Sequence, residues 1–388
     1  MKLRNDTVIP LSVPNIDGNE WLYVKECLDT GWISSAGSFV TRFEEDIATF
    51  TGAKHAVACV NGTAALHIAQ LVCGIKPNDY ILVPNLTFVA TLNAIKYVGA
   101  DPILFDVDPE TWQIDLDLVE EYLHEHAELR EDTLVHKSDG RKISAVIPVH
   151  VLGSMCDMQR LKQIATKYKL EVIEDAAEAL GSYYDQKHSG TIGNVGILSF
   201  NGNKIISAGG GGMLLTDKEH IAKRAKHLTT QAKSSTEEYI HDDVGYNYRL
   251  VNVLAAIGTA QLEKLPEIVK RNASRDSYYR AQLHDIDGIE FQSNLGNVEP
   301  NNWLTTIRIP DTRRVLDYLN TNGVQARMFW KPMNQLPMFA HNKYHTQRDV
   351  AAEIYNSAIS IPSSGGITDE QLEVVVHTLR LAVGTKGF

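Results

Sequence analysis

The stretch from residue 198 to 216, LSFNGNKIISAGGGGMLLT, brings together residue types that could do covalent chemistry. A single lysine, Lys204, lies between two apolar runs, and four glycines occupy positions 209–212. A lysine amine forms Schiff bases with carbonyl compounds once it is neutral. Glycines allow close backbone approach, because they have no Cβ. The pattern predicts a lysine presented to a carbonyl ligand, although most loop lysines are simply solvated.

Pyridoxal phosphate is a carbonyl cofactor that a lysine can hold in this way, and its ring nitrogen needs a carboxylate partner. The segment VIEDAAEALG places Glu174 and Asp175 at the end of a predicted strand. Successive strand residues face opposite sides, so only one of the two is expected to reach the ring. A strand-terminal acid could equally cap the next element. Glu178 could reach the phenolic oxygen of the ring or face water.

The cofactor's phosphate also needs a binding site. In VNGTAALHIAQ, the residues Asn61, Gly62 and Thr63 directly precede an amphipathic helix. A helix N-terminus binds anions through its free N–H groups and its dipole, although an ordinary N-cap would have the same sequence. Ser199 could add a hydroxyl group. Phe88 could stack on a flat ring, or it could be an ordinary core aromatic.

The surrounding elements are predicted from hydrophobic periodicity. Helices are expected at 19–30, 39–51, 62–74, 87–99, 115–126 and 157–168. Strands are expected at 80–84, 102–107, 143–150, 170–175, 196–200 and 212–216. This alternation predicts an α/β fold with a mostly parallel sheet covered by helices on both faces. Ligands of such sheets bind at the carboxyl ends of the strands, where Thr87, His150, Asp175 and Ser199 fall.

The pattern changes at the polar segment 232–245, which reads as a surface loop. A long helix is expected from about Leu250. We therefore predict a large domain over 1–250 and a smaller α+β domain over 251–388. The smaller domain has strand candidates at 303–309 and 324–328 and a final helix from residue 368.

Composition narrows the class of protein. The net charge of −11 argues against nucleic acid as the partner. No apolar run is long enough for a transmembrane helix, and the first residues lack the apolar core of a signal peptide. The four cysteines follow no zinc-binding or disulfide pattern. We expect a cytoplasmic protein without a metal site.

Taken together, the motifs resemble the DegT/DnrJ/StrS family of nucleotide-sugar aminotransferases, which have the fold-type I architecture of pyridoxal phosphate enzymes. The matching segments are NGTAALHIA, VPNLTFVATLNAI, DPILFDVDPETWQID, IPVHVLG, VIEDAAEALGS, GTIGNVGILSFNGNK and GYNYRLVNVLAAIGTAQLEKL. Two further segments, GWISSAGSFV and ARMFWKPMNQLPMF, look most like the branch that acts on UDP-linked 4-keto-6-deoxy-N-acetylhexosamines, including enzymes of legionaminic acid pathways.

The resemblance implies roles for individual residues. Lys204 would form the Schiff base with pyridoxal phosphate, and Asp175 would pair with the ring nitrogen. Glu178 stands where the family often has Gln or His, so its protonation state is open. The remaining implied cofactor contacts are Gly62, Thr63 and Ser199 to the phosphate, Phe88 over the ring, and Asn247 to the phosphate of a neighbouring subunit.

The implied activity is transfer of an amino group from L-glutamate to a nucleotide-linked keto sugar by a homodimer with shared active sites. Three alternatives stay open. A sugar dehydratase on the same fold would have histidine in place of Lys204. A non-catalytic regulator could lack Lys204 or Asp175. An unrelated nucleotide-binding α/β module would bind its ligand without a chromophore.

Overall fold

An eight-stranded sheet forms the centre of the computed structural model, which describes residues 8–235 and 237–384. Its strands are, in spatial order, β1 (His55–Cys59), β11 (Gly212–Thr216), β10 (Val195–Ser199), β7 (Glu171–Asp175), β6 (Ile143–Val146), β2 (Tyr80–Pro84), β3 (Asp101–Phe105) and β16 (Tyr344–His345). β11 runs antiparallel to both of its neighbours, and the other pairs from β10 to β16 are parallel. The predicted α/β class and mostly parallel sheet are confirmed.

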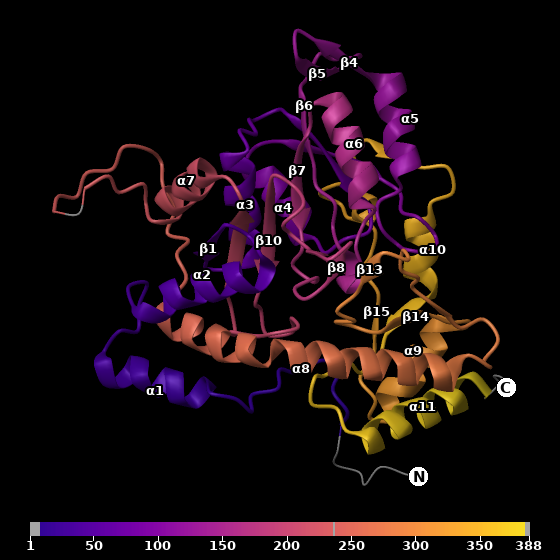
Figure 1. The fold of residues 1–388 in the computed structure, drawn as a ribbon. Coiled ribbons are helices and arrows are strands. Elements are labelled where there is room, and N and C mark those ends of the chain that lie inside the picture. Colours follow the sequence, from indigo (N-terminus) through magenta and orange to yellow (C-terminus); the bar gives the residue numbers. More distant parts are fainter. Residues whose placement is uncertain (1–7, 236, 385–388) are drawn as a thin grey trace.

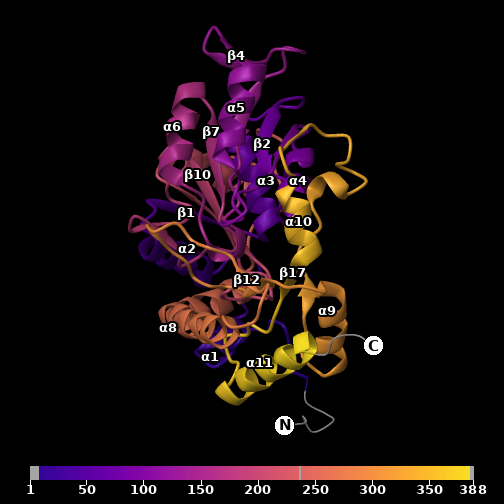
Figure 2. The same ribbon diagram turned by 90° about the vertical axis from the view of Figure 1, so that its right-hand side faces the viewer.

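Helices cover both faces of this sheet, because its central strands are apolar on both sides (Figures 1 and 2). One face packs against α3 (Gly62–Val72), α4 (Ala90–Tyr97) and α7 (Glu219–Thr229). The opposite face packs against α5 (Leu116–His126) and α6 (Met158–Tyr168) toward β3, and against α2 (Ser38–Thr51) and α8 (Asn252–Leu283) toward β1. The short helix α1 (Glu20–Thr30) lies against α8.

In Figure 1 the long helix α8 runs from the large sheet, where it packs beside α2, to a second group of helices, α9 (Thr312–Thr321) and α11 (Asp369–Gly384). Its second half packs into a separate apolar cluster with α9 and α11. A four-stranded antiparallel sheet completes this cluster, in the order β12 (Glu290–Phe291), β14 (Thr306–Arg308), β17 (Ala358–Ser360) and β15 (Arg327–Met328). Ile9 also belongs to the cluster and pairs with Val324. The division at residue 250 stays a prediction.

Six further elements are short. They are η1 (Val151–Gly153), β8 (Tyr183–Tyr184), β9 (Lys187–His188), β13 (Val298–Glu299), η2 (Met333–Gln335) and α10 (Val350–Ser357). β13, β8 and β9 form a small antiparallel sheet. In the described part of the chain, no helix combines the length and hydrophobicity needed to cross a lipid bilayer.

Several predicted boundaries differ from the structure. The strand predicted over 143–150 ends at Val146, and Val149 then makes only an isolated bridge to Asp175. Pro148 lies between them and has no N–H to donate to a neighbouring strand. The helix predicted over 87–99 begins at Ala90, so Phe88 lies in the turn before it. Strand β1 and helices α7, α9 and α10 were not predicted.

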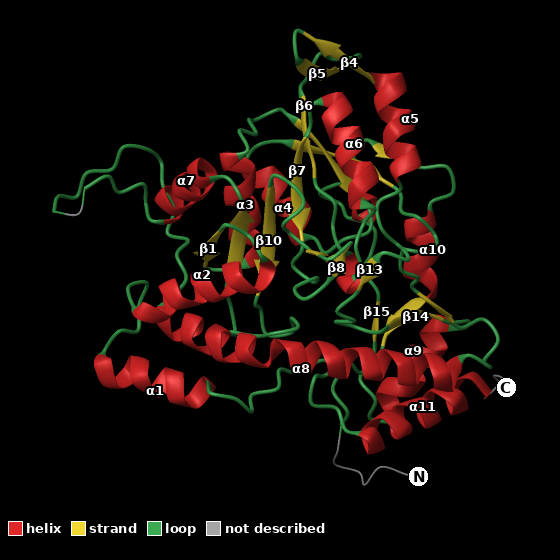
Figure 3. Cartoon of the chain, in the orientation of Figure 1, coloured by secondary structure: helices red, strands yellow, loops and turns green. Residues whose placement is uncertain are grey.

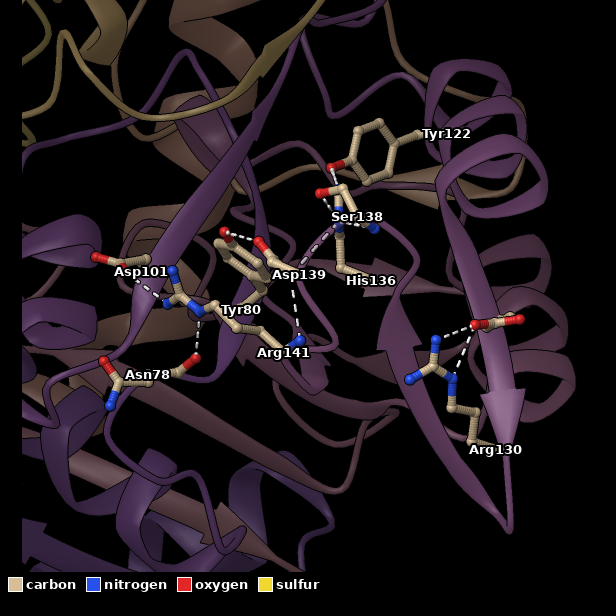
Figure 4. Close-up of polar contacts among 10 residues, drawn as sticks. Asn78, Tyr80, Asp101, Tyr122, Arg130, His136, Ser138, Asp139 and Arg141 are labelled. Carbon is tan, nitrogen blue, oxygen red and sulfur yellow. Dashed lines mark hydrogen bonds and ion pairs between the residues drawn. The ribbon is translucent and has the colours of Figure 1, made fainter.

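A hairpin of β4 (Ala127–Arg130) and β5 (Thr133–His136) was also not predicted, because its sequence is largely polar. It projects at the top of Figure 3, and Figure 4 shows the contacts beside it. The hydroxyl of Tyr80 donates to Asp139 at 2.9 Å. The Arg141 guanidinium donates to Asp101 at 2.6 Å and lies 3.8 Å from the centre of the Tyr80 ring. These contacts fasten a charged segment to the amino ends of β2 and β3.

Candidate active site

A cavity of about 600 Å³ lies at the carboxyl ends of the central strands. Ser199 ends β10, Asp175 ends β7, and Phe88 follows β2; all three line the cavity. Its opposite wall comes from distant parts of the sequence, including Trp303 and the segment 327–330. The cavity therefore has the position that the parallel sheet predicts.

Lys204 reaches this cavity from a turn that follows β10. Its backbone N–H donates to the carbonyl of Asn201 at 2.9 Å. Its Nζ lies 3.3 Å from Oε1 of Glu178 and 4.5 Å from the centre of the Trp303 ring. The side chain is only 12% exposed. Lys204 is thus an enclosed amine, and the alternative of a solvated loop lysine is wrong.

Asp175 faces the cavity with a buried carboxylate. Its Oδ2 accepts a hydrogen bond from the Thr91 hydroxyl at 2.7 Å, and its Oδ1 accepts one from the Ala177 N–H at 3.2 Å. Burial raises the pKa of this carboxyl group, and the bond from Thr91 and the charge of Lys204 oppose that rise. The site therefore holds an acid whose charged form gains from a cationic ligand group nearby.

Glu174 is directed away from the cavity, as the alternation of side chains in β7 predicts. Its Oε2 lies 2.9 Å from Nε2 of His150 and accepts from the Gly190 N–H at 2.9 Å, while its Oε1 accepts from the Ile192 N–H at 2.6 Å. Although burial alone would raise it, these bonds hold the pKa of Glu174 below its usual value. Glu174 is therefore an anchor for the adjoining loop.

Glu178 is a second buried acid on the cavity wall. Its Oε2 accepts from the Leu152 N–H at 2.9 Å while its Oε1 faces Lys204. Burial raises the pKa of Glu178, the Lys204 charge opposes this, and the nearby Asp175 charge adds to it. Two buried acids therefore lie on the cavity wall, and Glu178 is the one within ion-pair distance of the Lys204 amine.

The start of α3 forms a cradle in the wall of the cavity. Gly62, Thr63 and Ser199 line it, and the Asn61 side chain caps the helix by accepting from the Ala64 N–H at 2.7 Å. A Cβ on Gly62 would lie 2.9 Å from the Ser199 Cβ, so only glycine fits at this position. The cradle offers two hydroxyl groups and a helix N-terminus, which together suit an anion.

The glycine run beside Lys204 packs behind this cradle and does not border the described part of the cavity itself. Gly211 pairs with Asn61, and a Cβ on Gly212 would lie 2.5 Å from the Asn61 carbonyl. The glycines therefore let the returning chain pass against the first residues of α3.

Two aromatic residues border the cavity near β2 and β15. Phe88 lies in the turn before α4, with 53% of its surface exposed. Its ring centre is 6.2 Å from that of Trp330, and the two planes are tilted. Both residues line the cavity. Phe88 is thus placed to contact a flat ligand, and the alternative of an ordinary core aromatic is wrong.

Sequence reasoning missed three residues of this site. Thr91 lies one helical turn beyond Thr87, and their hydroxyls are 3.0 Å apart. The four-residue spacing could have predicted that Thr91 lies beside Thr87. Trp303 and Arg327 lie more than 90 residues from Lys204 in the sequence, and no local pattern marks them. Among the described residues that line the cavity, Lys204 and Arg327 are the basic ones.

Asn247 is placed outside this group. It is exposed, bridges to Thr230, and is absent from the described lining of its own chain's cavity. A role in its own site is therefore not visible, and its contact with a neighbouring subunit stays a prediction.

Comparisons with known proteins match nearly the whole chain. The model of the DegT/DnrJ/EryC1/StrS aminotransferase family matches residues 14–380. EpsN of Bacillus subtilis, named provisionally as a pyridoxal phosphate-dependent aminotransferase, is 36% identical over 379 residues and covers 95% of each chain. GDP-perosamine synthase of Caulobacter vibrioides is 35% identical over 377 residues, covering 96% of this chain and 97% of that one.

The fold also matches solved structures. Helicobacter pylori PseC, an aminotransferase involved in the biosynthesis of pseudoaminic acid, superimposes with a TM-score of 0.87 at 22% identity. The match covers 98% of this chain and 100% of that one. At this identity the likeness concerns the fold.

Proposed function

The chain belongs to the DegT/DnrJ/EryC1/StrS aminotransferase family, and from this premise we propose that it transfers an amino group from L-glutamate to a nucleotide-linked keto sugar with pyridoxal phosphate as cofactor. One observation carries the proposal. An enclosed lysine, a buried carboxylate and an anion cradle, from separate parts of the sequence, line one cavity.

The residues present fit pyridoxal phosphate. Lys204 would hold its aldehyde carbon through the amine, and Asp175 would hold the proton on its ring nitrogen. The phosphate would lie in the cradle of Gly62, Thr63 and Ser199, which a single added Cβ would obstruct. When bound, the cofactor supplies a ring that withdraws electrons from the carbon carrying the amine.

The chain's own residues supply the proton transfers. Lys204, once its amine is free, would take a proton from the donor's α-carbon and return it to the cofactor carbon that is bonded to the same nitrogen. Asp175 would favour the protonated ring nitrogen, because a buried carboxylate and a positive group beside it stabilise each other. The centre of the Trp303 ring lies 4.5 Å from the Lys204 amine, and the ring covers the amine on one side.

We propose a UDP-linked 4-keto-6-deoxy-N-acetylhexosamine as the first candidate acceptor, for use in a surface glycan or nonulosonic acid. The segments 31–40 and 326–339 support it by their resemblance to the legionaminic acid branch. A GDP-linked keto sugar is the second candidate, because curated relatives at 34–35% identity are named GDP-perosamine synthases. Arg327 provides a positive charge on the cavity wall for anionic substrate groups.

The active site is expected to be shared between two copies of the chain. Large apolar side chains are exposed on α1 and just beyond it: Trp21, Leu22, Leu28, Trp32 and Ile33. The segment between α7 and α8 projects from the body of the molecule in Figure 1, and its Tyr239 is 90% exposed. Exposed apolar groups of this size are typical of subunit contacts.

The test is incubation of the purified protein with L-glutamate and UDP-, GDP- and dTDP-linked 4-keto-6-deoxy sugars, with a dTDP-3-keto sugar as comparison. Mass spectrometry would detect conversion of a carbonyl to an amine, with 2-oxoglutarate as co-product. We expect the UDP sugar to be aminated fastest. Faster amination of the GDP sugar would support the second candidate, and no amination of any keto sugar would contradict the proposal.

A further inference from the structure

The amine of Lys204 lies between a carboxylate and an aromatic ring. Its Nζ is 3.3 Å from Oε1 of Glu178 and 4.5 Å from the centre of the Trp303 ring. The two partners come from different regions, Glu178 just after β7 and Trp303 shortly before β14. A carboxylate and an indole face both favour an ammonium ion over a neutral amine.

The Trp303 ring is fixed by bonds that need no ligand. Its indole N–H donates to the Asn203 carbonyl at 2.7 Å, and its backbone N–H donates to Oδ1 of Asn301 at 2.9 Å. The buried Arg275 guanidinium donates to the Trp303 carbonyl at 3.3 Å and also to that of Asn302. Trp303 is 4% exposed. The indole therefore presents a preorganised face to Lys204.

A single buried amide connects both partners of the lysine. Asn301 accepts from the Trp303 N–H through Oδ1, and its Nδ2 donates to the Glu178 carbonyl at 2.8 Å. Its backbone N–H is bonded to the Ser182 hydroxyl oxygen at 3.0 Å. Asn301 is fully buried. Asn301 therefore joins the backbone of Trp303 to the backbone of Glu178 through bonds that do not involve Lys204.

Few other charges face Lys204. Among the described residues that line the cavity, the charged ones are Asp175 and Glu178 from the end of β7, Lys204 itself, and Arg327 from β15. The Asp175 carboxylate already accepts bonds from Thr91 and Ala177. Glu178 is the carboxylate within ion-pair distance of the lysine.

We propose that Trp303 and Glu178 form a docking position for the free ammonium group of Lys204. The proposal rests on the proposed function, because only a lysine that leaves its cofactor in every cycle needs a place to be held. The docked ammonium would keep the proton it has taken until it returns that proton. Trp303 positions Lys204, because the face of its indole ring attracts the positive charge of the ammonium group.

The test measures the reactivity of Lys204 in the cofactor-free protein. Wild type, Trp303→Phe, Trp303→Leu and Glu178→Gln would be labelled with traces of acetic anhydride across a pH series. Acetylation of the Lys204 peptide would be compared by mass spectrometry with that of Lys223, whose side chain is 75% exposed. Only the neutral amine reacts, so the curve reports its protonation.

We expect the pH of half-maximal reactivity to fall in the order wild type, Trp303→Phe, Trp303→Leu, because the ring is first weakened and then lost. Below the midpoint, Trp303→Leu should react about 3- to 10-fold faster than wild type. Glu178→Gln should shift the curve in the same direction. Unchanged midpoints with a higher plateau would mean that Trp303 merely shields the lysine, and would overturn the proposal.

The experiment separates this proposal from the proposed function, since labelling uses neither cofactor nor sugar. A wild type that aminates a keto sugar but shows no midpoint shift in its variants contradicts the docking position alone. A wild type that aminates no sugar contradicts the function, whatever the labelling shows. If Trp303→Leu does not fold, Trp303→Phe and Glu178→Gln still decide the outcome.

Discussion

Nε2 of His150 lies 2.9 Å from Oε2 of Glu174, while the very next residue, Asp175, faces the cavity. Two adjacent acids at the end of β7 therefore have separate tasks. Glu174 holds the loop around Gly190 and Ile192 through their N–H groups. Asp175 is left to meet a ligand.

We expect Asp175→Asn to lower the turnover rate and Glu174→Gln to lower the stability. Asp175→Asn should still bind pyridoxal phosphate but lose at least about 100-fold in turnover, because an amide cannot keep the ring nitrogen protonated. Glu174→Gln breaks a buried pair and should lower the free energy of unfolding by roughly 3 kcal/mol. Steady-state kinetics would measure the turnover of Asp175→Asn, and urea unfolding would measure the stability of Glu174→Gln. Near-normal turnover in Asp175→Asn would assign the ring partner to another group.

This division between Glu174 and Asp175 was predictable, because a strand has a fixed alternation and a parallel sheet collects its ligands at one edge. Ser199 was predictable for the same reason, whereas Lys204 was predicted from the glycines beside it and Gly62 from the start of a helix. Trp303 was not. Its segment was predicted as part of a strand over 303–309, whereas β14 begins at Thr306. The ring meets Lys204 only through the packing of distant segments, which no local pattern encodes.

The hairpin of β4 and β5 is a second feature that local sequence patterns did not predict. Its residues are mostly polar, so periodicity gave no strand signal. It is held by contacts such as that of the Tyr122 hydroxyl with His136 at 2.9 Å, from the helix before the hairpin. The hairpin therefore depends on a partner outside its own sequence window, which a local pattern does not encode.

We predict that Lys204 holds pyridoxal phosphate covalently. The purified protein should be yellow, and borohydride should fix the cofactor's mass on the peptide containing Lys204, since reduction makes the carbon–nitrogen bond permanent. Lys204→Ala should give an unlabelled protein with the same melting temperature to within a few degrees. Label on any other lysine would contradict the assignment.

The glycine run supplies a prediction with its own control. Gly212→Ala should weaken pyridoxal phosphate binding at least about tenfold, because a Cβ there would lie 2.5 Å from the Asn61 carbonyl and displace the start of α3. Gly210→Ala is the matched control, since its Cβ would approach no described atom closer than 3.5 Å. Fluorescence titration of the cofactor-free proteins would measure both. Equal affinities would show that the start of α3 does not set phosphate binding.

His188 should make the stability depend on pH. Its Nε2 accepts from the Gly181 N–H at 2.8 Å, and burial lowers its pKa from 6.5 to about 4 despite the bond to the Ser189 carbonyl. The unfolded chain therefore binds this proton at a higher pH than the folded one. The stabilisation is complete above about pH 6.5 and is lost as the pH falls toward 4, by about 3 kcal/mol in total.

His188→Gln is the matched variant, because glutamine can make both hydrogen bonds and does not titrate. Between about pH 7 and pH 5, urea unfolding of wild type should lose about 2 kcal/mol more than that of the variant. Equal slopes in the two proteins would show that His188 is not the titrating group.

Asn247 should serve the active site of the neighbouring subunit. The Lys204→Ala chain lacks the lysine that binds the cofactor but has an intact Asn247. Asn247→Asp keeps its lysine but places a negative charge against the partner's phosphate, where like charges repel. Each variant alone should be inactive. A heterodimer of the two contains one site with both an intact Lys204 and an intact Asn247, so it should recover up to half of the wild-type activity.

The Lys204→Ala and Asn247→Asp chains would be co-expressed with different tags, because subunits of a stable dimer exchange slowly. The heterodimer would then be isolated by two affinity steps, one for each tag. Circular dichroism of both parents would establish that each is folded. Activity well above either parent means that the chains share the site, since neither chain alone has both residues. If Asn247 acted within its own chain, each site of the heterodimer would lack one group, and the isolated heterodimer would be inactive.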